Sequence, residues 1–283
     1  MLPIKPTAVW SVVKEIRAAA DDLRPVLVSG APEHARALRR ALVAGGDGHA
    51  VRDLSGGEVT RYDVQGAQVL VHVVDGPRPS EADEAALRIA GRNDVEVLCV
   101  LLGEPSGEPV DVPYVLATDV VAVAPGEALP IERIAERIAA RAGDNGYALA
   151  AKLPVLRRAV CEDIVRGFAR QNGILAAAIF IPGADLPVLL LNQIRMVFRI
   201  AAAHGENIDR ERAFELLPVI AAGFGLRAVA RSVVGVVPVV GWAAQGAIAF
   251  AGTRALGEAA IAYFEAGGTK RLEDLVRSVR SRS

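Results

Sequence analysis

The sequence predicts an α/β domain with a mostly parallel sheet, followed by an all-α domain with apolar helices. In the first half, short runs rich in Val and Leu alternate with longer segments of helical pattern, which is typical of a parallel sheet with crossover helices. In the second half the pattern is helical throughout. The two patterns meet at Gly143-Asp144-Asn145-Gly146, which predicts a helix stop and a linker. We therefore expect domains over residues 1–146 and 147–283.

The elements of the α/β domain are expected in chain order. Five apolar runs predict strands, the last of which could continue through Val120–Val123: they are Val26–Val28, Ala50–Leu54, Val69–Val74, Val97–Leu102 and Tyr114–Ala117. Helices are expected at Pro32–Leu42, Ser80–Ala90 and Pro130–Ala142. Proline is favoured in the first turn of a helix, and a serine followed by acidic residues is favoured at its start.

The composition excludes several classes of protein. A chain of 283 residues with a formal net charge of -1 is not a strongly basic nucleic-acid binder, and with 52% hydrophobic residues it is not largely disordered. Two cysteines, Cys99 and Cys161, do not make a disulfide or zinc scaffold, so a reducing, cytoplasmic compartment is expected. The mean hydropathy is +0.32 although only 5% of residues are aromatic. The apolar surplus therefore comes from aliphatic residues.

The segment after the first strand lies where nucleotide-binding sheets place their phosphate loop. The P-loop pattern is G-x-x-x-x-G-K-[ST], and the corresponding positions here are Gly30, Ala35, Arg36 and Ala37. Arg36 keeps the positive charge of the lysine that contacts the phosphates. Asp53, in Asp-Leu-Ser-Gly, fits the Asp-x-x-Gly pattern of a magnesium-sensing residue in GTPases. Gly30, Arg36 and Asp53 are thus the candidate nucleotide-binding residues.

Several features of the same segment argue against nucleotide binding. Pro32 removes a backbone donor, Glu33 places a carboxylate near the phosphates, and Ala37 cannot ligate Mg²⁺. The Asn-Lys-x-Asp motif that reads guanine does not follow Val97–Leu102. We therefore expect no catalytic residues and no cofactor, with GTP and Mg²⁺ as the alternative. The favoured interpretation of the segment is a strand-to-helix turn that only holds the fold.

The remaining chemistry-bearing residues are interpreted as structural. The four histidines are scattered and make no metal-ligand spacing with the two cysteines, so no metal site is expected. His72 lies within a Val-rich run and is interpreted as a hydrogen-bonded core residue. Cys99 lies in the middle of a strand and should be buried and unreactive.

The second half contains two apolar stretches, Ile174–Leu191 and Val233–Gly252. The second has 20 residues without a charge, which is long enough to cross a bilayer. Small residues every four positions allow helices to approach closely, either in a membrane or in a protein core, and both interpretations stay open. The residues assigned to membrane or helix packing are Pro238, Gly241, Ala243, Gly246, Ala247 and Ala251.

Two resemblances follow from these segments. The order VLVSGAPEHARALRRAL, AQVLVHVVDG, SEADEAALRIAGR, VEVLCVLLG and PYVLATDVVAV resembles an Era-type GTPase domain with a degenerate P-loop. The segments IPGADLPVLLLNQIRMVFRIAAAHG and VVPVVGWAAQGAIAFAGTRALGEAAIAYF resemble the YcjF-type domain of unknown function that follows such GTPase domains in bacteria. The second resemblance covers about Leu153 to Gly268. It implies a bacterial, membrane-associated or membrane-proximal protein.

The sequence thus favours a non-catalytic, GTPase-like adaptor or regulatory protein. Its expected partners are another protein, such as an active GTPase, and the inner membrane or a membrane partner. Its expected place is the cytoplasmic face of the inner membrane, or the cytoplasm. Two alternatives stay open: a weak GTP-binding switch with an atypical P-loop, and a soluble oligomeric scaffold in which the apolar helices pair between subunits.

Overall fold

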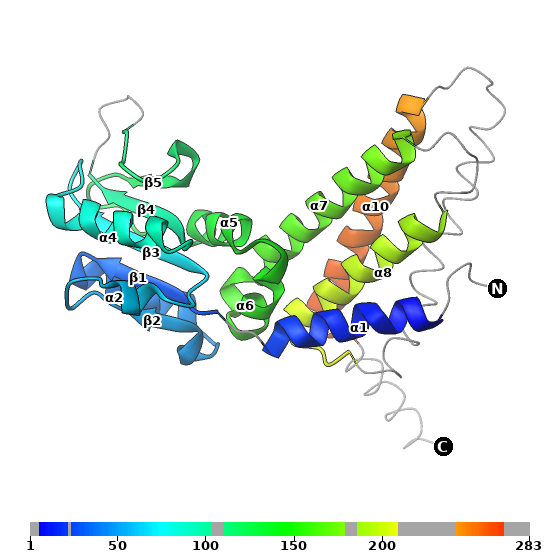
Figure 1. Cartoon of the computed structure of the whole chain (residues 1–283), viewed down its shortest axis with the longest axis horizontal. Coiled ribbons are helices and arrows are strands. Elements are labelled where there is room, and N and C mark those ends of the chain that lie inside the picture. The colour runs from blue at the N-terminus through cyan, green and yellow to red at the C-terminus, as the bar shows by residue number, and fades with distance from the viewer. Residues whose placement is uncertain (1–5, 22–23, 104–109, 179–185, 209–241, 269–283) are drawn as a thin grey trace. The chain divides into compact units, whose positions relative to one another are not determined.

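The computed structural model describes residues 6–21, 24–103, 110–178, 186–208 and 242–268 (Figure 1). They form two compact units. The α/β unit lies within residues 22–160, and the helical unit is made of residues from 1–21 and 161–283.

The described part of the α/β unit contains one parallel sheet. Its strands are β1 (Val26–Gly30), β2 (Val51–Asp53), β3 (Val69–Asp75), β4 (Glu96–Leu102) and β5 (Val120–Val123). They lie side by side in the order β2-β1-β3-β4-β5, and each neighbouring pair is parallel. This confirms the predicted α/β class with a parallel sheet. The order is a doubly wound one in which the direction of winding changes between β1 and β3.

Helices cover both faces of this sheet, as β3 and β4 require because their residues are buried almost throughout. The helices are α2 (Pro32–Val43), α3 (Arg61–Val64), α4 (Glu81–Arg92) and α5 (Ile131–Ala142). α3 and α4 contact each other, as do α2 and α5. Side chains alternate between the faces, so Leu70 and Val74 of β3 pack with Leu87 of α4.

Two predictions about this unit need correction. The run Tyr114–Ala117 is not a strand, because Tyr114 has a φ of 68° and the chain then forms a 3₁₀ turn, η2 (Ala117–Asp119), before β5. The expected first domain, residues 1–146, also differs from the α/β unit at both ends, because residues 6–21 belong to the helical unit and the α/β unit extends beyond residue 146. It includes α6 (Gly146–Lys152) and the 3₁₀ turn η4 (Pro154–Leu156), since their apolar side chains, such as Leu149, are buried within this unit.

The helical unit contains α1 (Pro6–Asp21), α7 (Arg157–Ala178, which joins this unit at Cys161), α8 (Leu186–Ala203) and α10 (Trp242–Glu265). α7 runs antiparallel to α10, since Gly173 is close to Gly246 whereas Val165 is close to Gly257. The helix backbones approach closely: a Cβ added at Gly246 would lie 2.9 Å from the Gly173 carbonyl oxygen. Glycine is therefore required at this crossing.

The described small residues that the sequence assigns to membrane or helix packing lie on two faces of α10, one buried and one exposed. Gly246 is buried against α7, as expected of a packing residue. Ala247 and Ala251 are exposed, because the packed face instead follows Gly246 through Ala249 and Thr253, at helical spacing. Pro238, Gly241 and the side chain of Ala243 lie outside the described residues.

None of the described helices combines the length and the apolar character needed to cross a bilayer. Of the stretch Val233–Gly252, the structure describes only the part from Trp242 onward, as the start of α10.

Replacing Gly257 by alanine is expected to destabilise the protein. The new Cβ would lie 2.4 Å from Cγ2 and 2.7 Å from Cγ1 of Val165, so α7 and α10 would have to move apart. We expect the free energy of unfolding in urea to fall by about 1–3 kcal/mol. Gly167→Ala is the matched control, because Gly167 is also helical and a Cβ there meets nothing within 4 Å. The control should gain up to about 1 kcal/mol; equal effects of the two substitutions would contradict the close helix contact.

Candidate functional site

The candidate site is the edge of the sheet where β1 and β3 end. Doubly wound sheets bind ligands outside the carboxyl ends of their strands, where the winding direction changes. Here β1 and β3 are paired in register, with Gly30 opposite Val73. Gly30, one of the predicted nucleotide-binding residues, thus lies at the position where a ligand would be expected.

The connection from β1 to α2 is a single residue. β1 ends at Gly30 and α2 begins at Pro32, which leaves only Ala31 between them. Gly30 has a φ of 92°, and a Cβ at this position would lie 2.0 Å from the Val73 carbonyl oxygen. The Ala31 amide donates a hydrogen bond to the same oxygen at 2.8 Å. The backbone at this point is therefore held against β3.

The first turn of α2 also limits what can bind there. Of its first four residues, Pro32 has no amide hydrogen, and the amide of Ala35 donates to the Ala31 carbonyl at 2.8 Å. The amides of Glu33 and His34 remain for an anion, and the exposed carboxylate of Glu33 is in the same turn. The positive end of the helix dipole is thus partly offset by a negative side chain.

The structure brings the other two predicted residues, Arg36 and Asp53, near each other. Both are exposed, Arg36 on α2 and Asp53 at the end of β2. Partial burial raises the pKa of Asp53, but hydrogen bonds from Ser55 and the charges of Arg39 and Arg36 outweigh it, so that the pKa is lowered. The Ser55 amide donates to Oδ1 of Asp53 at 2.9 Å. Arg36 therefore acts on a carboxylate of the same protein.

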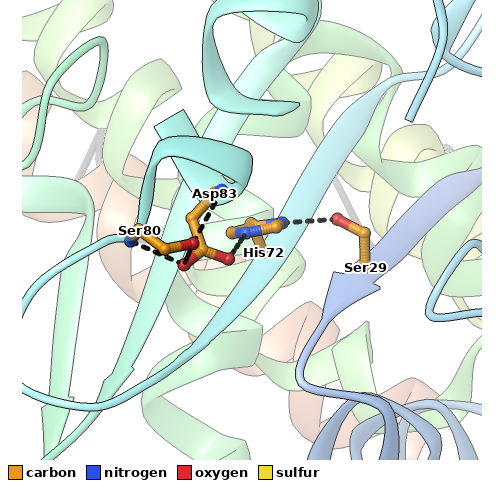
Figure 2. A network of polar contacts seen from close by, with 4 residues as sticks. All are labelled: Ser29, His72, Ser80 and Asp83. Atoms are coloured by element: carbon orange, nitrogen blue, oxygen red, sulfur yellow. Dashed lines mark hydrogen bonds and ion pairs between the residues drawn. The ribbon is translucent and has the colours of Figure 1, made fainter. Parts of the chain in front are cut away.

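A buried polar chain crosses the sheet just before this edge (Figure 2). Ser29 of β1 lies opposite His72 of β3, and Ser29 Oγ is 2.7 Å from His72 Nδ1. His72 Nε2 is 2.8 Å from Oδ1 of Asp83, in the first turn of α4. The other oxygen of Asp83 accepts from the amide of Ser80, the N-cap residue, at 2.8 Å. The chain thus joins two strands to the start of a helix.

The hydrogen bonds define the protonation state of His72. A carboxylate only accepts, so Nε2 carries the hydrogen donated to Asp83, and Nδ1 accepts from the Ser29 hydroxyl. Burial lowers the pKa of His72 below 6.5, although the hydrogen bond to Asp83 and its charge oppose this. Burial raises the pKa of Asp83, but the hydrogen bonds from Ser80 and His72 prevail and the pKa is lowered. The pair is therefore a neutral imidazole beside a carboxylate.

This arrangement has the residue types of a Ser-His-acid hydrolase but not the access that a nucleophile needs. Ser29 is 0% exposed and His72 is 3% exposed. A substrate cannot reach Ser29 Oγ in this conformation. The chain instead satisfies polar groups inside an apolar layer and fixes the start of α4 against β3.

The interpretation of His72 as a hydrogen-bonded core residue is confirmed, whereas Ser29 and Asp83 were not recognised from the sequence. The serine and aspartate three positions apart, Ser80 and Asp83, form a capping box, which was a signal that Asp83 lies in the first turn of a helix. The pairing of Ser29 with His72 depends on the strand register, for which the sequence holds no local signal.

The thiol of Cys99 lies in the same buried layer as His72. It lies opposite His72 on β4 and is 0% exposed. Burial, with a contribution from the charge of Asp83, raises the pKa of the Cys99 thiol to about 12. The prediction of a buried, unreactive thiol is confirmed. Within the described ranges, no group of three or more His, Cys, Asp or Glu residues could hold a metal ion.

Comparison with known proteins adds no identification. No protein-family model matches the chain, and no curated protein matches it.

Replacing Gly30 by alanine tests the close approach of β1 to β3. We expect the free energy of unfolding to fall by about 3 kcal/mol or more, because the added Cβ would overlap the Val73 carbonyl. Gly66→Ala is the control, since Gly66 also has a positive φ, 74°, but open space around it. The control should lose only about 1 kcal/mol, from backbone strain alone. A loss at Gly30 no larger than at Gly66 would be inconsistent with the contact.

The neutral state of His72 predicts a pH dependence of stability. Because its pKa is lowered in the folded state, the unfolded state binds more protons below pH 6.5, and stability falls as the pH falls. The free energy of unfolding should decline by up to about 1.4 kcal/mol per pH unit, the limit for one proton. The carboxylates with lowered pKa contribute only at lower pH.

The measurement is urea unfolding between pH 8 and 5. His72→Gln should remove this decline, while His34→Gln, at an exposed histidine, should keep it. An unchanged decline in the His72 variant would show that another group is responsible.

Proposed function

We propose that this protein is a non-catalytic adaptor. Its α/β unit has a GTPase-like sheet that carries no nucleotide, and its helical unit associates with the cytoplasmic face of the bacterial inner membrane or with a membrane partner. The observation that carries the first part of this proposal is the single-residue connection between β1 and α2.

The geometry of a phosphate cradle explains why this connection matters. A P-loop binds phosphates because several consecutive backbone amides wrap around them. Here Ala31 donates its amide hydrogen to Val73, and the chain turns directly into the helix at Pro32. The positions that correspond to the glycine and lysine of a P-loop, Ala35 and Arg36, lie inside α2. This arrangement supports an α/β unit without a nucleotide.

The charges near this edge support the same conclusion. The carboxylates of Glu33, Asp53 and Asp75 are all exposed at or next to the carboxyl ends of the strands. Each of them would repel a triphosphate. Arg36 is the predicted cation for the phosphates, but it already lies near Asp53.

Exposed apolar side chains support a protein partner for the α/β unit. Tyr114 and Leu116, in the segment before β5, are 55% and 60% exposed. Tyr114 also has a positive φ, which is uncommon for a bulky residue and is found more often at functional positions. We expect a partner to contact the unit through these residues.

Isothermal titration calorimetry with GTP and Mg²⁺ tests the absence of a nucleotide site. We expect no binding heat from the full chain, because the Ala31 and Ala35 amides already donate hydrogen bonds within the protein and Pro32 has no amide hydrogen. Tight, Mg²⁺-dependent binding that Arg36→Ala abolishes would overturn the adaptor proposal and favour the switch. Arg40→Ala is the matched control, since Arg40 is exposed on the same helix.

A further inference from the structure

At one end of the helical unit the described residues carry no charge, and we name this part the bundle tip. It consists of residues 173–178 of α7, 186–191 of α8 and 242–252 of α10. Ala176, Leu189 and Ala249 of the three helices form one buried cluster there. The last turns of α7 and the first turns of α8 and α10 therefore lie together, and none of these residues carries a charge.

The surface of the bundle tip is apolar. Ile174, Val188 and Phe250 are 62%, 47% and 39% exposed, one from each helix. In the described part of the helical unit, these are the large hydrophobic side chains that remain exposed. Ala247 and Ala251 of α10 are exposed as well. Exposed apolar residues gathered at one end of a unit indicate a surface that contacts something apolar.

A layer of buried, hydrogen-bonded amide and hydroxyl groups lies next to the bundle tip, between the three helices. Asn172 donates to Thr253 Oγ1 at 3.1 Å, Asn192 donates to Asn172 Oδ1 at 2.9 Å, and Gln193 donates to Thr253 Oγ1 at 3.4 Å. The Thr253 hydroxyl donates to the Ala249 carbonyl at 2.7 Å. These bonds link α7, α8 and α10, so the end of the bundle is held together without charges.

Arginines follow directly behind this layer. On each of the three helices, the first charged residue met on leaving the bundle tip is an arginine: Arg170, Arg195 or Arg254. Arg170 is exposed on α7. Arg195 pairs with Glu15 of α1 at 3.1 Å, and Arg254 pairs with Glu258 at 2.8 Å. The order along all three helices is thus the same: apolar surface, buried polar layer, arginine.

We propose that the bundle tip inserts into one leaflet of an anionic lipid bilayer, with the arginines at the level of the lipid phosphates. This rests on the membrane association in the proposed function and assigns it to a surface. The order of apolar surface and arginine matches the order of hydrocarbon and phosphate in a leaflet. A protein partner would not require this order on every helix, so the observations favour a lipid surface.

The length of the α10 part of the bundle tip, the longest of the three, fits one leaflet. At 1.5 Å per residue, the α10 part from Trp242 to Gly252 is roughly 16 Å long, against about 15 Å for half of the hydrocarbon core. The bundle tip is therefore long enough to enter a leaflet and too short to cross the bilayer. This agrees with the absence of a membrane-crossing helix among the described residues.

Vesicle flotation with the full chain tests this proposal. Vesicles of phosphatidylcholine with phosphatidylglycerol should carry the wild-type protein upward in a density gradient. Ile174→Glu with Phe250→Glu should weaken vesicle binding at least about tenfold, because two carboxylates would have to enter hydrocarbon. Both residues are exposed, so the variant should keep the wild-type circular dichroism spectrum. Tyr62→Glu with Gln65→Glu, at exposed residues of the α/β unit, is the control and should bind as the wild type does.

The arginine layer has its own variant. Arg170→Gln should weaken binding to the anionic vesicles several-fold and leave binding to pure phosphatidylcholine vesicles unchanged. Absence of flotation by the wild type, or equal flotation of the bundle-tip variant, would overturn the proposal.

A further outcome would assign the bundle tip to self-association. If the wild type is an oligomer in analytical ultracentrifugation, the bundle-tip variant is a monomer and neither binds vesicles, then the lipid proposal is wrong.

Calorimetry with GTP tests the adaptor proposal independently of the lipid proposal. Nucleotide binding by the wild type would overturn the adaptor and leave the lipid contact standing, whereas failed flotation would leave the nucleotide-free α/β unit standing.

Discussion

The close approach of β1 to the carbonyl group of Val73 determines much of the α/β unit. The carbonyl oxygen occupies the space of a side chain at position 30 and accepts the hydrogen bond of the Ala31 amide. With the backbone held there, α2 starts after one residue, and this short connection supports the proposal that the α/β unit carries no nucleotide. The same register places Ser29 opposite His72, which in turn contacts Asp83 at the start of α4.

Both units contain polar side chains inside apolar layers, and in both the polar groups bind one another. In the α/β unit the buried chain consists of Ser29, His72 and Asp83. In the helical unit it consists of amides and a hydroxyl on three helices. A buried polar group without a partner costs free energy, so each network favours one arrangement of its elements over others. These networks position the sheet edge and the bundle tip.

The sequence predicted the elements that depend on local patterns. β1, β3 and β4 follow runs of buried Val and Leu, and the start of α4 follows from the capping serine Ser80. The last strand was placed too early, because Val112 and Val115 are apolar residues of a loop that packs on the core. The alignment of Arg36 with a P-loop lysine stays a prediction; in the structure Arg36 lies inside α2. Strand register and helix contacts, which create the buried networks, join residues far apart in the chain and left no local signal.

The protection of the Ala31 amide is the most direct test of this account. Amide hydrogen exchange, followed by NMR on the full chain, would be compared with and without GTP and Mg²⁺. The structure predicts that this amide exchanges slowly in both conditions, because it already donates to the Val73 carbonyl. An Ala31 amide that exchanges rapidly in the free protein, and becomes protected only when GTP is added, would contradict the closed connection and the adaptor function derived from it.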